Sequence, residues 1–329
     1  MKIGLVLSTP YEGSMGVAVR VTDLSKSLIN LGVEVHVFSP FSVPGLENTA
    51  AIIHPLDNIV SRLGISQTVY SSLQKCLSTP VLARNTILTK RVISSIINSF
   101  SKTIYAVAKD VDLDLIQGEQ EIASIACLNI KDKLKIPVVS SLHNIWPEEL
   151  VASDIIRNDD SRFHYLMSLE KEIAEHSDMI IVLSESMKDY IHQQISSYSG
   201  NNVVVVPLGS RPRISNVEYL SNLSRVVHAG LLSKLDNVDL FIDSMPYVKE
   251  RFTNVSFHLT DKGEACSSTK KHAQNLHVEP NFFWYPNSID FFNFLKSCHI
   301  GVVTSKNHIT RKFGYTMKFF DYLSVGIPA

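Results

Sequence analysis

The sequence predicts an α/β protein built from two doubly wound parallel sheets. Short apolar runs, typical of buried parallel strands, alternate with amphipathic helical segments along the chain. A second series of this kind begins near Arg225, after a boundary at residues 207–210. The length of 329 residues suits two domains with a core each. We therefore expect one Rossmann-like domain over residues 1–207 and a second over residues 208–329.

The first forty residues predict a strand, a loop, a helix and a second strand. Ile3 to Leu7 is a short apolar run, and Val33 to Phe38 is another. Between them, apolar residues recur at helical spacing and a glycine takes the C-cap position. These residues are Val17, Val21, Leu24, Leu28, Leu31 and Gly32. This β-α-β order is the usual opening of a doubly wound sheet.

Later apolar runs predict the remaining strands. In the first domain they are Leu113 to Ile116, Pro137 to Val139, Met179 to Leu183 and Val203 to Val206. In the second domain they are Arg225 to His228, Val255 to Leu259 and Ile300 to Thr304. Helices such as Tyr165 to Ala174 fill the gaps, so both sheets should be mainly parallel.

Composition and charge narrow the classes of function. A net charge of −1 argues against a general nucleic-acid binder. The cysteines are scattered, as expected for reduced core residues of a cytosolic protein; they are Cys76, Cys127, Cys266 and Cys298. The apolar run at the N-terminus is too short for a signal peptide, and no stretch approaches the length of a membrane span. We expect a cytoplasmic protein that touches a membrane at most at its surface.

Two features of the first domain are candidate ligand sites. Gly13 to Gly16 forms a loop between a strand and a helix, where a backbone without side chains approaches an anion closely. The alternative is a tight turn of the kind found in any α/β domain. His143 follows a strand and should lie at its carboxyl end, where open α/β sheets bind ligands. The alternative is a core or surface histidine.

The last segment is the most informative. A turn leads into a helix, and the backbone N–H groups of Gly314, Tyr315 and Thr316 are placed to hold a diphosphate. Lys318 and Asp321 are one turn apart and share a face of that helix. Asp321 is suited to accept hydrogen bonds from a ribose. The alternative is an i, i+3 salt bridge on a solvated helix.

With those residues in view, the chain resembles the retaining glycosyltransferases of family 4, which have the GT-B fold. The segment Lys318 to Pro328 is similar to the family motif KxfEYxaxGxP, which is fairly specific. Weaker matches arrive in the family's order: the opening unit to Gly16, Asp114 to Ile116, Pro137 to His143, Ser177 to Glu185, and Val206 to Gly209. The resemblance implies two domains that face an interdomain cleft. The first would receive a glycan or lipid-linked acceptor, and the second would bind a nucleotide-diphosphate sugar as donor.

The resemblance also implies roles at matching positions. Gly16 would approach the donor phosphates, and His143 would line the reaction centre. The amides of residues 314–316 would bind the diphosphate, with Lys318 beside them. Asp321, in place of the usual Glu, would hold the ribose. A helix N-terminus and cations would stabilise the leaving group, so we expect no metal and no cofactor.

Three positions depart from the family pattern. Phe313 stands where the family has the first acid of an acidic pair, and Leu231 stands where it has a phosphate-binding arginine. Lys234 is about two residues early for the expected lysine. Lys234, Arg211 or Lys318 would therefore have to supply the missing positive charge.

The chain also ends at Ala329, where the family continues, so we expect the second domain to be truncated. Two other interpretations remain open. One is a catalytically impaired homologue that only binds a nucleotide sugar or a partner. The other is a nucleotide-sugar epimerase of the same fold, which the motif near the end does not favour.

Residues 58–109 contain no acid but seven bases. An apolar stripe at helical spacing runs from Val92 to Val107 in the same segment. Lys90, Arg91 and Lys102 are candidates for contact with an acceptor or with an anionic membrane at the inner face of the cell. The alternative is an ordinary core helix. The core-helix and the membrane-contact interpretations are compatible if the stripe packs inward while the bases face outward.

Overall fold

The computed structural model describes residues 1–8, 15–40, 45–56, 86–195, 202–213, 224–285, 288–314 and 316–329. The chain separates into two compact units, Met1–Pro207 and Leu208–Ala329. Each unit holds one parallel sheet, and the second sheet is the smaller. The protein is therefore an α/β protein with two parallel sheets, as the alternation of strands and helices predicts.

The sheet of the first unit has the strand order β3-β2-β1-β4-β5-β6-β7, and every pair in it is parallel. The strands are β1 (Lys2–Leu7), β2 (Glu34–Ser39), β3 (Ile52–Pro55), β4 (Leu115–Glu119), β5 (Val138–Ser141), β6 (Met179–Val182) and β7 (Val203–Val205). The chain first moves outward from β1 to β3 and then returns to β4 on the other side of β1. The strand order thus reverses between β1 and β4, the point at which doubly wound sheets bind ligands.

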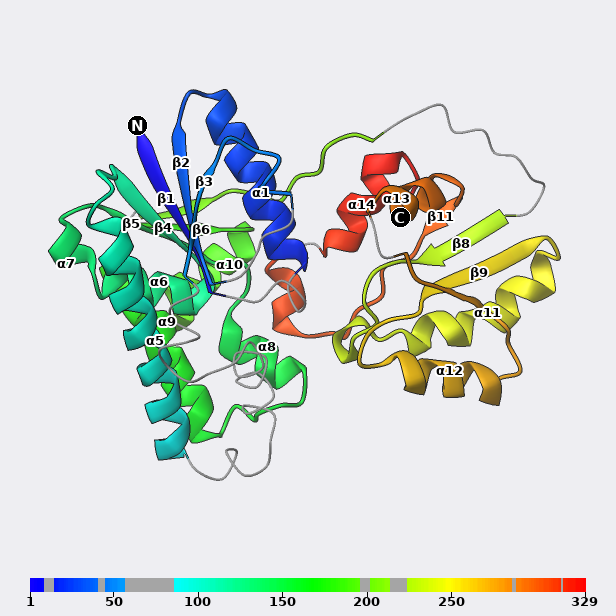
Figure 1. The fold of residues 1–329 in the computed structure, drawn as a ribbon. Helices are drawn as coiled ribbons and strands as arrows, with labels where there is room; N and C mark the ends of the chain where they lie inside the picture. Colours follow the sequence, from blue (N-terminus) through cyan, green and yellow to red (C-terminus); the bar gives the residue numbers. More distant parts are fainter. Residues whose placement is uncertain are drawn as a thin grey trace. The chain divides into compact units, whose positions relative to one another are not determined.

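Helices cover both faces of this sheet (Figure 1). They are α1 (Met15–Asn30), α5 (Thr86–Ala108), α6 (Gln120–Leu128), α7 (Lys131–Leu134), α8 (Trp146–Ala152), α9 (Ser161–His176), α10 (Glu185–Tyr190) and the π-helical turn η1 (Ile191–Ile195). Side chains alternate across a strand, so β1 supplies both cores. Leu5 packs with Val21 of α1 on one face. Val6 packs with Ile104 of α5 and Ala123 of α6 on the other.

The second unit repeats this plan on a smaller scale. Its parallel sheet has the order β10-β9-β8-β11. The strands are β8 (Ser224–His228), β9 (Val255–Thr260), β10 (Asn281–Phe283) and β11 (Ile300–Gly301). The helices are α11 (Asp239–Arg251), α12 (Cys266–Asn275), α13 (Ser288–Lys296) and α14 (Met317–Val325), with 3₁₀ turns η2 (Lys234–Asp236) and η3 (Ile309–Lys312). The order reverses at β8, which makes the end of β8 the switch point of this sheet.

Two strands differ from the sequence expectation in ways that matter for the site. β4 continues three residues past Ile116 to Glu119, because it pairs with β1 and β5 over that stretch. β11 is only two residues long, although the apolar run predicts a strand up to Thr304. Just beyond Gly301, the N–H of Val302 still donates to the carbonyl oxygen of Val227 at 2.8 Å, and the hydroxyl of Tyr322 lies 3.2 Å from the carbonyl oxygen of Val302.

The apolar stripe of α5 packs inward. Ile93, Ile97, Phe100 and Ile104 are all at most 4% exposed, so the core-helix interpretation of this stripe is correct. The three bases Lys90, Arg91 and Lys102 are exposed, and Lys90 Nζ lies 5.2 Å from the centre of the Tyr165 ring of α9. The earlier part of the acid-free segment, residues 58–85, lies outside the described residues. No helix among the described residues has the length and apolar character needed to cross a bilayer.

Candidate functional site

The carboxyl ends of β1, β4 and β5 bring a polar cluster together in the first unit. In the sheet register, Glu119 lies opposite Leu7 on one side and Ser141 on the other. His143 follows Ser141 by two residues and turns back over the ends of these strands. His143 therefore lies at the carboxyl end of β5, as predicted, and Glu119 lies beside it at the carboxyl end of β4.

His143 and Glu119 form a direct pair. His143 Nε2 lies 2.9 Å from Glu119 Oε2, and the side chains are 12% and 0% exposed. Gln117 Nε2 donates to the other carboxylate oxygen at 2.6 Å. Burial alone would raise the pKa of Glu119, but the hydrogen bond from His143 and the nearby charge of Arg20 hold the pKa below its usual value. Glu119 therefore carries its negative charge inside the fold.

Arg20 of α1 reaches the same cluster. Its Nη2 donates to Ser141 Oγ at 3.4 Å. Burial lowers the pKa of Arg20, and the charge of Glu119 works against that shift. Neither Arg20 nor Glu119 was predicted from the sequence. The apolar run ends at Ile116, so Glu119 did not stand out as the last residue of a buried strand.

A buried pair of acids, Glu121 and Glu170, lies beside the loop that follows His143. Glu170 of α9 accepts the backbone N–H of Trp146 at 3.1 Å. Burial raises the pKa of Glu170, and the neighbouring Glu121 raises it further. Burial raises the pKa of Glu121 to about 8. The two carboxyl groups are therefore not both ionised at neutral pH.

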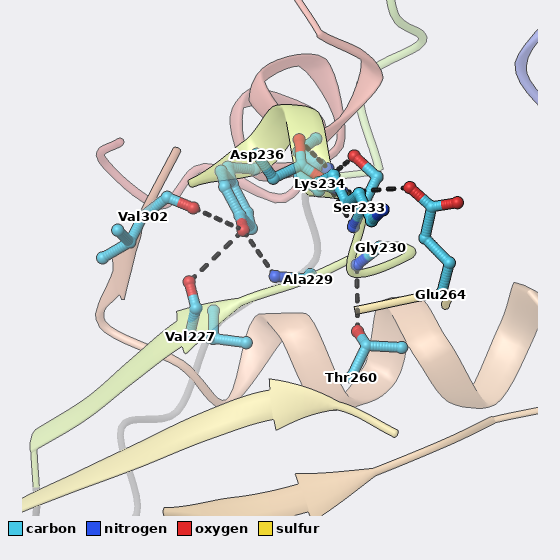
Figure 2. Close-up of polar contacts among 11 residues, drawn as sticks. Val227, Ala229, Gly230, Ser233, Lys234, Asp236, Thr260, Glu264 and Val302 are labelled. Atoms are coloured by element: carbon cyan, nitrogen blue, oxygen red, sulfur yellow. Dashed lines mark hydrogen bonds and ion pairs between the residues drawn. The ribbon is translucent and has the colours of Figure 1, made fainter. Parts of the chain in front are cut away.

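In the second unit, the end of β8 is the centre of a polar network (Figure 2). Lys318 Nζ lies 2.9 Å from Asp236 Oδ1, and these side chains are 13% and 4% exposed. The other oxygen of Asp236 accepts the backbone N–H of Ser233 at 3.1 Å and its hydroxyl at 2.8 Å. Burial would raise the pKa of Asp236, but Lys318 keeps it below its usual value. The carboxylate is therefore charged and fully bonded.

The aliphatic part of the Lys318 side chain packs closely over Gly230. A Cβ at Gly230 would lie 3.0 Å from Lys318 Cε, and the backbone φ of +96° is one that glycine adopts readily. The amide of Gly230 donates to Thr260 Oγ1 at 3.0 Å (Figure 2). The amide of Ala229 donates to the hydroxyl of Tyr322 at 2.7 Å. These contacts fasten α14 to the ends of β8 and β9.

The alternative of a solvated salt bridge between Lys318 and Asp321 is wrong. Lys318 pairs with Asp236 instead, because its side chain points back over Gly230 toward η2. Asp321 is partly buried, and its carboxyl group makes no hydrogen bond to the described residues, whereas its backbone carbonyl accepts from Ser324 Oγ at 2.7 Å. Burial raises the pKa of Asp321 to about 7, against the charges of Arg213 and Lys318. Its carboxyl group keeps its capacity to accept hydrogen bonds.

The other expected donor-site residues have different surroundings. Thr316 is the N-cap residue of α14, and its hydroxyl is buried without a partner among the described residues. Gly314 precedes it, and Tyr315 lies outside the described residues. Lys234 is exposed, and its amide donates to Glu264 Oε1 at 3.1 Å. Gly16 lies in the first turn of α1, whereas residues 9–14 of the glycine loop lie outside the described residues.

Two further residues bear on what the second unit can do. Phe313, where the family has an acid, is 1% exposed and belongs to the packed interior. His228 at the end of β8 is completely buried, and in the described part of the chain neither ring nitrogen has a hydrogen-bond partner. Burial, assisted by the charge of Lys318, lowers the pKa of His228 to about 4. His228 is therefore neutral.

Asp112 and Asp114 precede β4 with the D-x-D spacing of a metal-binding motif, but Asp114 has a structural contact. Asp114 Oδ2 accepts the backbone N–H of Lys2 at 2.6 Å. Across the described residues, no three His, Cys, Asp or Glu side chains gather as a metal site would require.

The sequence of this chain matches a known protein family. The model of Glycosyltransferase Family 4 matches residues 15–210. An uncharacterized glycosyltransferase of Bacillus subtilis (strain 168), YqgM, is 22% identical over 213 residues. That match covers 63% of this chain and 56% of the relative, so the chain matches little more than half the length of that curated protein.

Solved structures show the same fold. Sucrose-phosphate synthase from Thermosynechococcus elongatus has a TM-score of 0.69 at 13% identity, over 100% of this chain and 80% of the other. Anabaena HepE in complex with UDP-glucose has a TM-score of 0.66 at 14% identity, over 100% and 79%. S. aureus TarM, in a complex that includes UDP, has a TM-score of 0.67 at 11% identity, over 99% and 84%. These likenesses establish a GT-B-like architecture.

Proposed function

The chain belongs to glycosyltransferase family 4, a retaining family, and we propose that it transfers a hexosyl group from a nucleotide-diphosphate sugar to a glycan or lipid-linked acceptor. The anomeric configuration is retained, and neither a metal nor a further cofactor takes part. Residues 1–207 receive the acceptor, and residues 208–329 bind the donor.

The observation that carries the proposal is the arrangement at the end of β8. The stem of Lys318 on α14 lies over Gly230 just after β8, at the switch point of a parallel sheet, and Asp321 is one turn further along the same helix. Open α/β sheets bind ligands at such points. A helix N-terminus with a cation beside it favours a diphosphate, and a carboxyl group within a turn of them favours the ribose.

Lys318 is the cation that takes the place of the missing arginine at Leu231. An ammonium group has three donors, and Asp236 uses one of them, which leaves two for diphosphate oxygens. Lys234 is exposed and lies within reach as an outer cation. Gly314, Tyr315 and Thr316 contribute backbone amides to the diphosphate.

Electrostatics supplies the mechanism. Breaking the bond between the sugar and the phosphate builds negative charge on the leaving nucleoside diphosphate. Each fixed donor aimed at that charge contributes roughly 3 kcal/mol of transition-state stabilisation, or about two orders of magnitude in rate. We assign His143 to the reaction centre.

Uridine diphosphate is the nucleotide that we propose for the donor. HepE was crystallised with UDP-glucose, and TarM was crystallised with UDP. Both share the fold of this chain over nearly its whole length, which supports the same class of donor here.

The acceptor side is proposed to lie at the inner surface of the cell membrane, with the protein in the cytoplasm. Lys90, Arg91 and Lys102 are exposed on α5. Each basic residue near an anionic bilayer contributes about 1 kcal/mol of attraction.

One observation favours a second candidate, a homologue that binds a nucleotide sugar without transferring it. Phe313 is packed in the interior where the family has an acid, so no carboxyl group acts from that position.

Calorimetry and a transfer assay test the two candidates together. Wild-type protein should bind UDP, and Asp321→Ala should weaken binding by at least about 1 kcal/mol. His143→Ala should reduce transfer far more than it reduces UDP binding. Binding without turnover of any UDP-sugar would favour the impaired homologue. Unchanged affinity in Asp321→Ala would remove the ribose assignment.

A further inference from the structure

Glu119 has a place in the first unit that no motif of the sequence explains. It is the last residue of β4, between the ends of β1 and β5. A buried carboxylate is costly unless its hydrogen bonds are filled. Gln117 fills one oxygen at 2.6 Å, and His143 fills the other at 2.9 Å. The fold thus keeps a charged group at the edge where ligands bind.

The backbone around Glu119 is shaped to present it. Gln120, the next residue, has a left-handed φ of +66°, which is uncommon outside glycine and is often found at functional sites. Gly118 has no room for a side chain, since a Cβ there would lie 2.5 Å from Ser124 Cα. Ser124 Oγ also donates to the carbonyl oxygen of Gly118 at 3.2 Å. This tight turn starts α6 directly after Glu119.

The contacts fix where the imidazole of His143 carries its proton. An ionised carboxylate only accepts hydrogen bonds, so Nε2 must be the protonated nitrogen that donates to Glu119. Ser141 Oγ lies 3.3 Å from the same nitrogen. Among the described residues, nothing is hydrogen-bonded to Nδ1. In the neutral ring, Nδ1 therefore presents a lone pair.

We propose that Glu119 is a positioning residue for glycosyl transfer, which holds His143 in the tautomer protonated on Nε2 so that Nδ1 accepts a hydrogen bond from a substrate hydroxyl. This inference rests on the proposed function. His143 touches the substrate and Glu119 acts through it, in the way that a carboxylate orients the histidine of a catalytic triad. The hydroxyl belongs either to the donor sugar or to the acceptor.

The test compares two glutamate–histidine pairs of the same unit. Glu119→Gln removes the charge but keeps the size of the side chain. The matched control is Glu34→Gln, because Glu34 Oε1 lies 2.8 Å from His36 Nε2 at the amino end of β2, away from the ligand edge. With UDP-glucose as donor, Glu119→Gln should lower kcat about 100-fold and leave KM within about threefold. Glu34→Gln should leave both unchanged.

The position of the ring proton of His143 can be measured without an activity assay. Nitrogen-15 NMR of the histidine rings, with the His143 signals assigned from their loss in His143→Gln, should show a proton on Nε2 in the wild type. Glu119→Gln should lose that preference. If the variant does not fold, the wild-type spectrum and the kinetics of Glu119→Asp still decide. A wild-type proton on Nδ1, or wild-type kcat in Glu119→Gln, overturns the proposal.

Hydrolysis of UDP-glucose without an acceptor identifies the hydroxyl. If hydrolysis falls together with transfer in Glu119→Gln, Nδ1 meets the donor sugar. If only transfer falls, Nδ1 meets the acceptor. Absence of turnover in the wild type would defeat the proposed function, while the ring spectrum would still test the role of Glu119.

Discussion

The ion pair between Lys318 and Asp236 makes a quantitative prediction about stability. Two unit charges 2.9 Å apart attract each other by at most about 6 kcal/mol at an effective dielectric constant of 20. Desolvation of two nearly buried groups cancels part of this. Removing one partner should cost about 3 kcal/mol, because the other charge is left buried without compensation.

The perturbation is a double-mutant cycle with Lys318→Met and Asp236→Asn. Methionine matches the length of the lysine stem, and asparagine can still accept from Ser233. Each single variant should lose about 3 kcal/mol of unfolding free energy. The double variant should be no less stable than either single one, which gives a coupling energy of at least about 3 kcal/mol.

Urea unfolding of the four proteins, followed by circular dichroism and tryptophan fluorescence, measures the cycle. The double variant should regain stability yet bind UDP more weakly than the wild type, because it lacks the cation. A coupling energy below about 0.5 kcal/mol, the usual range for an exposed pair, would refute the burial argument. Full UDP affinity in the double variant would refute the role of Lys318 at the donor site.

Three further predictions follow from other groups. Burial raises the pKa of Glu121 to about 8. The protonated form therefore contributes fully to the free energy of unfolding below about pH 4.5, and this contribution is lost as the pH rises to about 8. In urea unfolding, Glu121→Gln should reduce this loss of stability with pH. Burial raises the pKa of Asp321 to about 7, so calorimetry should show UDP affinity rising between about pH 6 and pH 8 as the carboxylate forms, and Asp321→Asn should abolish the rise. Liposome sedimentation should show salt-sensitive binding to anionic vesicles that the double substitution Lys90→Glu/Arg91→Glu abolishes; failure to bind at low salt would favour a soluble acceptor.

The sequence predicts the architecture because apolar periodicity reports burial directly. The helix of α5 and its inward stripe follow from the spacing of Ile93, Ile97 and Ile104 alone. Strand ends are less visible. The apolar run that leads into β4 stops at Ile116, and pairing with β1 and β5 carries the strand on to Glu119. The partner of His143 was missed for this reason.

The donor site shows the same limit. The helix carrying Lys318 and Asp321 is evident from the motif near the end of the chain. The partner of Lys318 is not, because Asp236 lies far away in sequence and only the turn at Gly230 brings the two together. Tyr322 was likewise unassigned, although its buried hydroxyl binds the amide of Ala229 and anchors α14 on β8. Contacts between distant segments carry no local pattern.

The most direct test of the account is proton NMR of the anomeric signal during turnover of UDP-sugars by the wild-type chain. We predict that at least one UDP-sugar is consumed and that the first product, whether transferred to an acceptor or released by water, keeps the anomeric configuration of the donor. A product of inverted configuration, or no consumption of any UDP-sugar by a chain that binds no UDP, would contradict the assignment of a retaining transferase.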